Sequence, residues 1–485
     1  MGSSRLSTAE VVAGVDCSTQ STKVLLVDVA SGRVLDKASA PNEVTGEGGA
    51  RESDPREWAN ALRRALCALE RRHEIRALSV GAQQHGLVAL GPDDEPVAPA
   101  PLWNDTRAAM DASRLVDALG GPAACAAETG SVLTGSFTAC HWARWKRERP
   151  DLVGRVAKVM LPHDYLSFCL TGRAATDRSD VSGTGWWSPG TQAYSERVLA
   201  LPEIELTPEQ LPDVVAPDAA AGEITAQAAE RFGLAEGTPV ACGAGDNAAA
   251  SLALGLMAGE AALSLGTSGT VFAPSRSPSW DHTGTVAGFA GADGGWLPLA
   301  CTLNATLAVD QVAAWLQIGR EDVAPSGPVI FLPWLGGERT PNLPMASGAA
   351  AGLRHGTTPG AILQAAYEGL VATLLDALGR LAEWAPQDAG QPLLLVGGGA
   401  RGATWQETVR RLSGRPVLIP DAQELVAYGA AAQAAALATN RHPNDVARIW
   451  GGRRGLELPA VERDTETLER VVAFREHMTS WYGRS

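Results

Sequence analysis

The hydrophobic pattern at the start of the chain predicts three strands joined by short polar turns. Residues 11–16 (VVAGVD) form an apolar run typical of a buried strand. A small polar turn occupies 17–23, and residues 24–29 (VLLVDV) predict a second strand. The turn SGRV then leads into a third strand. We therefore expect a β-meander at the start of a domain.

The same pattern returns in the middle of the chain. Residues 261–272 (AALSLGTSGTVF) repeat the order of apolar strand, small polar turn and β-branched strand. The two stretches share little sequence but the same succession of residue types. The repetition predicts two domains of like topology that face each other across a cleft.

Helical periodicity alternates with these strand patterns. A helix is predicted within 52–72, and the segment 107–180 is expected to be largely helical. Residues 176–187 are polar and rich in glycine, so we expect a surface loop there. Residues 359–385 predict an amphipathic helix, and 392–420 predict strand, triple glycine, helix and strand. This alternation is typical of an α/β fold.

Length and charge narrow the class of protein. The 485 residues exceed what one hydrophobic core usually organises, so two large domains are expected. The net charge of −14 disfavours nucleic acid and anionic membranes as partners, because their phosphates would be repelled. We find no signal peptide and no run of about 18 apolar residues, and therefore expect a soluble, cytoplasmic protein. The seven cysteines include no CxxC pair, which favours free thiols.

Asp246 is the strongest candidate for a catalytic group. It lies in GAGDNAAA, where a strand gives way to a helix expected to begin near Asn247. An aspartate there can act as the N-cap, and the positive end of the helix would favour its ionised form. An ionised carboxylate at neutral pH is what a general base requires. Capping alone is the alternative, and the two roles are compatible.

Asp16 and the two small polar turns are candidates for binding phosphate and metal. Asp16 ends the first strand, where a carboxylate could hold Mg²⁺ through water. Turns of small residues can present backbone N–H groups to phosphate, although neither is a Walker A loop. An ordinary hairpin is the alternative for the first turn. The first turn contributes Ser18, Thr19, Gln20, Ser21 and Lys23, and the second contributes Gly266, Thr267 and Ser268.

Two other polar segments are candidates for a ligand rich in hydroxyl groups. Gln84 and His85 interrupt a strand pattern, and His85 would donate hydrogen bonds to sugar hydroxyls. In PLWNDTR, Asp105 could accept hydrogen bonds from a polyol, and Trp103 could cover an apolar sugar face. A purely structural role for each residue is the alternative.

Taken together, these stretches resemble the FGGY carbohydrate kinases, within the larger sugar kinase–heat-shock–actin group. The resemblance runs from about Val11 to about Ala435. The stretches that carry it are GVDCSTQSTK, AQQHG, LWNDTR, LPHDYL, ATDRSDVSGT, GAGDNAAA, LSLGTSG, FLPWLGGERTP and GGGAR.

The resemblance implies two ribonuclease-H-like α/β domains of the actin/hexokinase ATPase type, separated by a deep cleft. The sugar-binding domain is expected at 8–250, the ATP-binding domain at 251–440, and a helical C-terminal tail at 441–485. Asp246 matches the catalytic base, Asp16 a residue important for Mg²⁺ or activity, and either carboxylate could hold the metal. The implied sugar contacts are Gln84, His85, Trp103, Asp105 and Asn247. The implied ATP contacts are the two turns, Gly397, Gly398, Gly399, Ala400 and Gly429.

The implied reaction is ATP- and Mg²⁺-dependent phosphorylation of D-xylulose to D-xylulose 5-phosphate. Related kinases that act on ribulose, glycerol or gluconate are the nearest alternative, and a non-catalytic sugar sensor on the same fold is the second. Two positions depart from the family pattern. Gln84 stands where family members acting on xylulose often have Met, and Gly402–Thr404 lack the Asn found in some members. The oligomeric state stays open, with a homodimer as one option.

Overall fold

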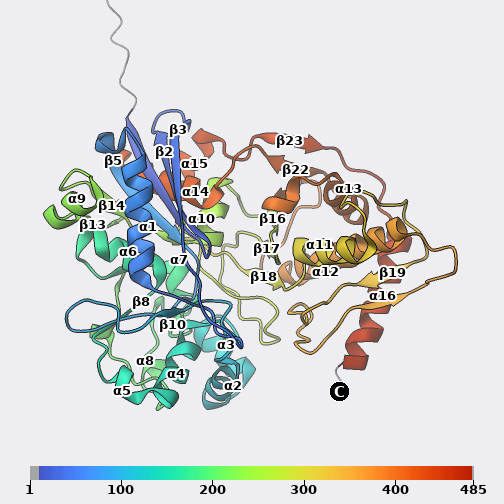
Figure 1. Ribbon diagram of the computed structural model, residues 1–485, viewed down its shortest axis with the longest axis horizontal. Coiled ribbons are helices and arrows are strands. Elements are labelled where there is room, and N and C mark those ends of the chain that lie inside the picture. Colours follow the sequence, from blue (N-terminus) through green and yellow to red (C-terminus); the bar gives the residue numbers. More distant parts are fainter. Residues whose placement is uncertain (1–9, 483–485) are drawn as a thin grey trace, which may run out of the picture.

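Two α/β lobes, each built on a mixed sheet, make up the structure (Figure 1). It is a computed structural model that describes residues 10–482. The first sheet has the order β13-β14-β5-β1-β2-β3, and the second has the order β18-β17-β16-β21-β22-β23.

The two sheets share one topology. In the first, β1 pairs antiparallel with β2 and parallel with β5. In the second, β16 pairs antiparallel with β17 and parallel with β21. The predicted repetition of strand, turn and strand is therefore confirmed. The first sheet comprises β1 (Val11–Cys17), β2 (Ser21–Asp28), β3 (Val34–Pro41), β5 (Ile75–Ala82), β13 (Ala220–Glu223), β14 (Pro239–Ala241) and the adjoining β15 (Ala244–Gly245). The second comprises β16 (Ala261–Leu265), β17 (Gly269–Phe272), β18 (Leu299–Thr302), β21 (Leu393–Val396), β22 (Val417–Pro420) and β23 (Gly455–Leu458).

Helices cover the faces of the sheets and fill the lower part of the first lobe (Figure 1). The helices of the first part of the chain are α1 (Pro55–Ala68), η1 (Arg72–Glu74), α2 (Ala109–Ala118), α3 (Pro122–Thr129), α4 (Thr138–Glu148), α5 (Pro150–Val153), α6 (Pro162–Thr171), α7 (Arg178–Val181), α8 (Glu196–Leu199), η2 (Pro208–Gln210), α9 (Ala226–Phe232) and α10 (Asp246–Ala253). Those of the second part are α11 (Thr306–Leu316), α12 (Pro359–Leu381), η3 (Gly398–Arg401), α13 (Ala403–Ser413), α14 (Leu425–Thr439), α15 (Pro443–Trp450) and α16 (Thr465–Tyr482).

The remaining strands form two-residue or three-residue pairs outside the main sheets. They are β4 (Glu52–Ser53) with β7 (Ala100–Pro101), β6 (Val88–Leu90) with β8 (Lys158–Met160), β9 (Ala175–Asp177) with β12 (Asp213–Val215), β10 (Trp187–Ser188) with β11 (Ala193–Tyr194), and β19 (Ile330–Leu332) with β20 (Ala349–Ala351).

Helix α14 returns from the second half of the chain to pack on the first sheet. It lies against β1, β5 and α10, so part of the expected second domain at 251–440 contributes to the first lobe. Glycines permit this close approach. A Cβ on Gly14 would lie 1.9 Å from the carbonyl oxygen of Ala427, and one on Gly429 would lie 1.9 Å from that of Ala249. Gly429 therefore serves helix packing, and it lies in the interior against α10.

The segment 176–187 is buried, so its expectation as a surface loop is wrong. It forms β9, α7 and the start of β10, and Thr176, Ser179, Asp180 and Ser182 have almost no exposed surface. Several of these polar side chains bond to the backbone of the same segment, which offsets the cost of burying them. Asp177 accepts hydrogen bonds from the N–H groups of Ser179 and Asp180 and thereby caps α7.

The segment expected as a helical tail also contains a strand. Strand β23 extends the second sheet by pairing antiparallel with β22, while α15 packs on α14 of the first lobe. The segment thus joins both lobes. Helix α12 is long and apolar enough to cross a membrane, but 78% of its apolar window is buried in the second lobe, as in the core helix of a globular protein. All seven cysteines are free.

Candidate functional site

The second small polar turn and the triple glycine lie against each other in the second lobe. In the second turn, the Gly266 carbonyl accepts hydrogen bonds from the backbone and hydroxyl of Thr306. Gly397 has a φ of 85°, and a Cβ there would lie 2.8 Å from the carbonyl oxygen of Leu265. Only glycine allows the loop after β21 to approach the second turn this closely. The backbones of the second turn and of the glycine loop therefore run close together, an arrangement that phosphate-binding loops use.

A cavity of about 620 Å³ opens beside these loops. It brings together Asp16 and Lys23 from the first lobe with Gly397, Gly398 and Ala400 from the second. Glu424, which sequence reasoning missed, also lines it and forms an ion pair of 2.6 Å with Lys23. The size and lining suit a polar ligand of nucleotide size. Gly429 does not line this cavity.

Asp16 is held at the end of β1 with one oxygen unsatisfied. Its side chain is 7% exposed, and Lys23 Nζ lies 3.8 Å from Oδ2. The other oxygen, Oδ1, is buried without a hydrogen-bond partner. Burial raises the pKa of Asp16 to about 7, with Lys23 opposing the shift and Asp246 adding to it. A carboxylate in this condition would be stabilised by a cation.

The residues fit a weakly coordinated Mg²⁺. Among residues 10–482, no group of three or more His, Cys, Asp or Glu side chains could enclose a metal ion. Mg²⁺ bound with a nucleotide usually takes only one or two carboxylates and keeps phosphate oxygens and water as its other ligands. The orphaned oxygen of Asp16, with the nearby charge of Asp246, meets that requirement.

Asp246 opens α10 and is oriented by its neighbour. Its Oδ1 accepts hydrogen bonds from the backbone N–H of Asn247 at 2.7 Å and from the side-chain amide of Asn247 at 2.8 Å. Gly245 is the N-cap residue, so the expected N-cap position of Asp246 is wrong by one residue. Burial raises the pKa of Asp246 to about 6, and the Asn247 hydrogen bonds oppose the shift. The second oxygen remains available to take a proton.

His85 accepts rather than donates at the site. Its Nδ1 lies 2.6 Å from the carbonyl oxygen of Gly183, so Nδ1 carries the hydrogen and donates it. Burial lowers the pKa of His85 to about 4, so the ring is neutral and Nε2 is an acceptor. The prediction that His85 donates to sugar hydroxyls is therefore wrong. The ring also packs against Phe137 and Phe289, with 4.8 Å and 5.7 Å between ring centroids. The backbone φ of His85 is 70°, which turns the residue out of the strand direction.

Helix α7 links the strand end at Gln84 to the helix of Asp246. The Nε2 of Gln84 lies 3.4 Å from the carbonyl oxygen of Ser179, and a Cβ on Gly245 would lie 2.8 Å from the same nitrogen. The hydroxyl oxygen of Ser179 accepts a hydrogen bond from the backbone N–H of Gly245 at 3.1 Å. The structure thus brings Gln84, His85, Asp246 and their common support together.

Asp105 differs from its predicted role because its oxygens are occupied. It is 1% exposed, accepts hydrogen bonds from the side chain of Arg107 and from the backbone of Arg51, and Arg107 also pairs with Glu52. These hydrogen bonds, against the opposing effect of burial, lower the pKa of Asp105. Its geometry is that of a structural anchor. Trp103 is 38% exposed and donates from Nε1 to the Thr19 hydroxyl at 3.2 Å, so it lies beside the first turn.

The first turn is stabilised by its own side chains. The hydroxyl and N–H of Ser18 both donate to the carbonyl of Ser21, at 2.9 and 3.0 Å. The Thr19 hydroxyl donates to Gln83 Oε1 at 2.8 Å, which ties the turn to the strand end before His85. Gln20 is exposed at the tip.

Sequence reasoning also missed a buried charge cluster behind the base. His163 Nδ1 lies 2.7 Å from Asp180 Oδ2, and Nε2 lies 3.2 Å from Asp164 Oδ1. Burial would lower the pKa of His163, but the surrounding carboxylates, Asp164 first, raise it to about 10, which favours the protonated ring. The quoted stretches LPHDYL and ATDRSDVSGT contained these residues, but only the fold shows that they meet.

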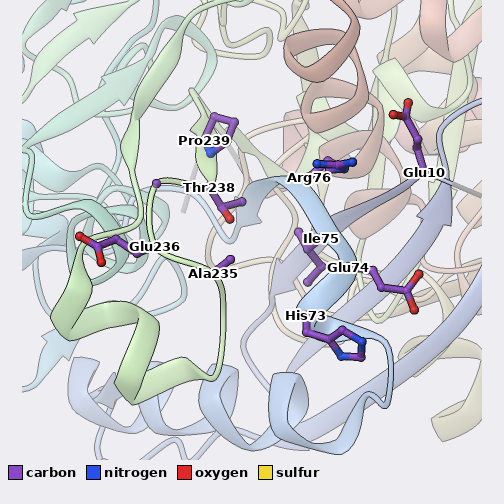
Figure 2. Close-up of a pocket in the computed structure, with 10 residues that line it drawn as sticks. Glu10, His73, Glu74, Ile75, Arg76, Ala235, Glu236, Thr238 and Pro239 are labelled. Carbon is purple, nitrogen blue, oxygen red and sulfur yellow. The ribbon is translucent and has the colours of Figure 1, made fainter.

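Another large opening lies at the opposite end of the first sheet. A groove of about 680 Å³ is bordered by Glu10, Glu74 and Glu236 near the amino ends of β1, β5 and β14 (Figure 2). Their carboxylates are spread around it rather than converging (Figure 2). In sheets of this kind, ligands bind at the carboxyl ends of parallel strands, where Asp16 and Gln84 lie.

Comparison with known proteins places this site in a family. Residues 11–253 match the N-terminal domain, and residues 261–438 the C-terminal domain, of the FGGY family of carbohydrate kinases. The chain belongs to the FGGY family of carbohydrate kinases. It is thus a carbohydrate kinase, for which ATP is the phosphoryl donor.

Individual relatives agree with the family. The chain is 56% identical over 465 residues to a xylulose kinase of Streptomyces coelicolor, covering 95% of both chains. It is 55% identical over 464 residues to a xylulose kinase of Streptomyces rubiginosus, again covering 95% of both. A solved structure of a xyloylose kinase from Brucella ovis superposes with a TM-score of 0.89 at 30% identity, covering 97% of this chain and 100% of that one. The two ribonuclease-H-like domains expected for FGGY kinases are therefore confirmed.

Proposed function

We propose that this FGGY kinase phosphorylates D-xylulose at its 5-hydroxyl with ATP. The observation that carries the proposal is the position of Asp246: Ser179 links its neighbour Gly245 to Gln84, and its charge acts on Asp16 at the end of β1. The two Streptomyces relatives that are 55% and 56% identical over 95% of the chain support xylulose as the substrate.

Asp246 would act as the general base. The sugar oxygen attacks the γ-phosphorus, its proton passes to the free oxygen of Asp246, and the bond from the γ-phosphorus to the oxygen of the departing ADP breaks. With a pKa of about 6, most of the Asp246 carboxylate is ionised at pH 7 and can accept a proton. The same pKa lies close enough to pH 7 for the carboxyl group to hold that proton during the transfer. The Asn247 hydrogen bonds fix the direction of the carboxylate.

The chain's own groups orient the remaining parts. The neutral Nε2 of His85 accepts from a sugar hydroxyl, and the Gln84 amide is the adjacent polar contact. The ATP phosphates would lie in the cavity lined by Lys23, Gly397, Gly398 and Ala400, and Asp16 with Asp246 would hold Mg²⁺. When bound, Mg²⁺ neutralises phosphate charge, which is much of what phosphoryl transfer requires.

The two lobes are assigned different substrates. We propose sugar binding in the first lobe and nucleotide binding chiefly in the second, with α14 from the second half of the chain buttressing α10. Closure of the lobes over the sugar would exclude water, which could otherwise accept the phosphoryl group.

A coupled assay of ADP release tests the proposal. Mg-ATP would be supplied with D-xylulose, D-ribulose, L-ribulose, glycerol or gluconate, using the wild type and Asp246→Asn. We expect a preference for D-xylulose and at least a 10²-fold lower turnover for Asp246→Asn, since a positioned base contributes about 10²–10⁴-fold. Preference for another sugar would contradict the substrate, and near-full activity of Asp246→Asn would contradict the mechanism.

A further inference from the structure

The motif Gly336–Pro341 has no role in the function proposed above. It lies between β19 and β20 in the second lobe. Its central pair, Glu338 and Arg339, contrasts sharply: Glu338 is 1% exposed, whereas Arg339 is partly exposed. This contrast indicates that the buried Glu338 fixes the position of its more exposed neighbour Arg339.

Glu338 anchors the loop to the end of β18. Its carboxylate accepts hydrogen bonds from the backbone N–H of Leu303 at 2.6 Å and of Arg339 at 2.8 Å. The Asn304 amide donates to Glu338 at 3.0 Å and to the Gly337 carbonyl at 2.7 Å. The Thr340 hydroxyl donates to the Cys301 carbonyl at 2.8 Å. The backbone of Arg339 is therefore held from both sides.

The Arg339 side chain faces the first lobe. It lines a narrow cavity together with Ser131 and Phe137 of that lobe. Phe137 packs on the ring of His85 at 4.8 Å. The Arg339 charge is also close enough to help lower the pKa of His85, after the larger effect of burial. The Arg339 cation of the second lobe thus lies near His85, the acceptor that the first lobe is proposed to offer the sugar.

Among residues 10–482, the Arg339 guanidinium has no hydrogen-bond or ion-pair partner. A guanidinium offers five donors in a planar fork and no acceptor, so it suits an oxygen-rich neutral or anionic ligand.

We propose that Arg339 is a sugar-binding residue supplied by the second lobe, donating hydrogen bonds to oxygens of the ketose that His85 contacts from the first lobe. The proposal rests on the proposed function, because it takes the sugar to lie beside His85. It makes sugar affinity depend on both lobes. Bound sugar would then link the lobes directly and favour their closure.

Variants Arg339→Gln and Arg339→Lys test the proposal against Arg354→Gln, an exposed arginine of the same lobe. We expect Arg339→Gln to raise KM for D-xylulose about 10–100-fold, the range for a lost hydrogen bond to a charged group. Lysine retains the charge but not the fork, so Arg339→Lys should lie between Arg339→Gln and the wild type. KM for ATP and sugar-independent ATP hydrolysis should stay within twofold.

Two controls separate this inference from the proposed function. Calorimetric binding of D-xylulose reports on Arg339 without requiring turnover, and the wild-type substrate panel reports on the function alone. If the wild type prefers another sugar, that sugar replaces D-xylulose in both measurements. A sugar affinity within threefold of wild type in Arg339→Gln, or a parallel rise in KM for ATP, would overturn the assignment of Arg339. If Arg339→Gln fails to fold, Arg339→Lys decides by the same criteria.

Discussion

The Ser179 hydroxyl accepts a hydrogen bond of 3.1 Å from the backbone N–H of Gly245, the residue immediately before Asp246. The carbonyl of the same serine accepts from Gln84 Nε2 at 3.4 Å. One buried residue therefore supports both the proposed base and a proposed sugar contact, although Ser179 touches neither substrate. Its role is to position them.

Ser179→Ala should lower turnover, although it removes only one hydroxyl group that does not touch the substrates. The substitution leaves the buried N–H of Gly245 without its acceptor, which costs about 1–3 kcal/mol and loosens the start of α10. We expect kcat to fall about 10-fold or more, because a displacement of about 1 Å at a reacting group can cost 10²-fold. KM for ATP should be unchanged. Steady-state kinetics of this variant and of Ser277→Ala, a control at an exposed serine, would check this. Equal kinetics in the two variants would contradict it.

His85 should make stability pH-dependent in a defined window. Burial lowers its pKa from 6.5 to about 4, so the unfolded chain binds more protons than the folded one between these values. The stability that His85 contributes is present above pH 6.5 and is lost as pH falls toward 4. The wild type should lose up to about 2–3 kcal/mol more than His85→Gln over this range. Urea unfolding of both proteins at pH 7 and pH 4.5 measures the difference; parallel pH profiles would contradict the buried neutral ring.

His163→Gln should destabilise the first lobe strongly. The imidazolium pairs with Asp180 and lies among Asp164 and Asp177, so its removal leaves carboxylates buried without a cation. Breaking a buried ion pair on one side costs about 3–5 kcal/mol. Chemical unfolding measures the free energy of unfolding of His163→Gln and of His282→Gln, a control at an exposed histidine. A loss below about 1 kcal/mol would argue that the cluster is neutral in the folded state.

Gly429→Ala should destabilise, although glycine to alanine within a helix normally stabilises by about 1 kcal/mol. The new Cβ would lie 1.9 Å from the carbonyl oxygen of Ala249 on α10, so α14 must move. Overpacking of this kind costs about 1–3 kcal/mol. Since α10 begins with Asp246, turnover should fall as well. Gly356→Ala, which has open space around the new Cβ, is the control in a thermal unfolding assay. A stabilised Gly429→Ala would show that α14 does not press on α10.

The sequence by itself determined the strand–turn–strand pattern of each lobe and the positions of Asp16 and Asp246 at strand and helix ends. Strand periodicity, turn composition and helix starts are local properties, so neighbouring residues suffice to specify them. The triple glycine before α13 was predictable for the same reason.

Only the tertiary structure decided which partner each polar side chain has. Gly183 lies 98 residues from His85 and turns the imidazole from a donor into an acceptor. Arg107 and the backbone of Arg51 occupy the oxygens of Asp105, and α14 crosses back to the first sheet over glycines at both contacts. The burial of residues 176–187 likewise depends on contacts with residues far away in the chain. Hydrogen-bond partners and close packing are chosen among residues far apart in the chain, and no local pattern records which of them meet.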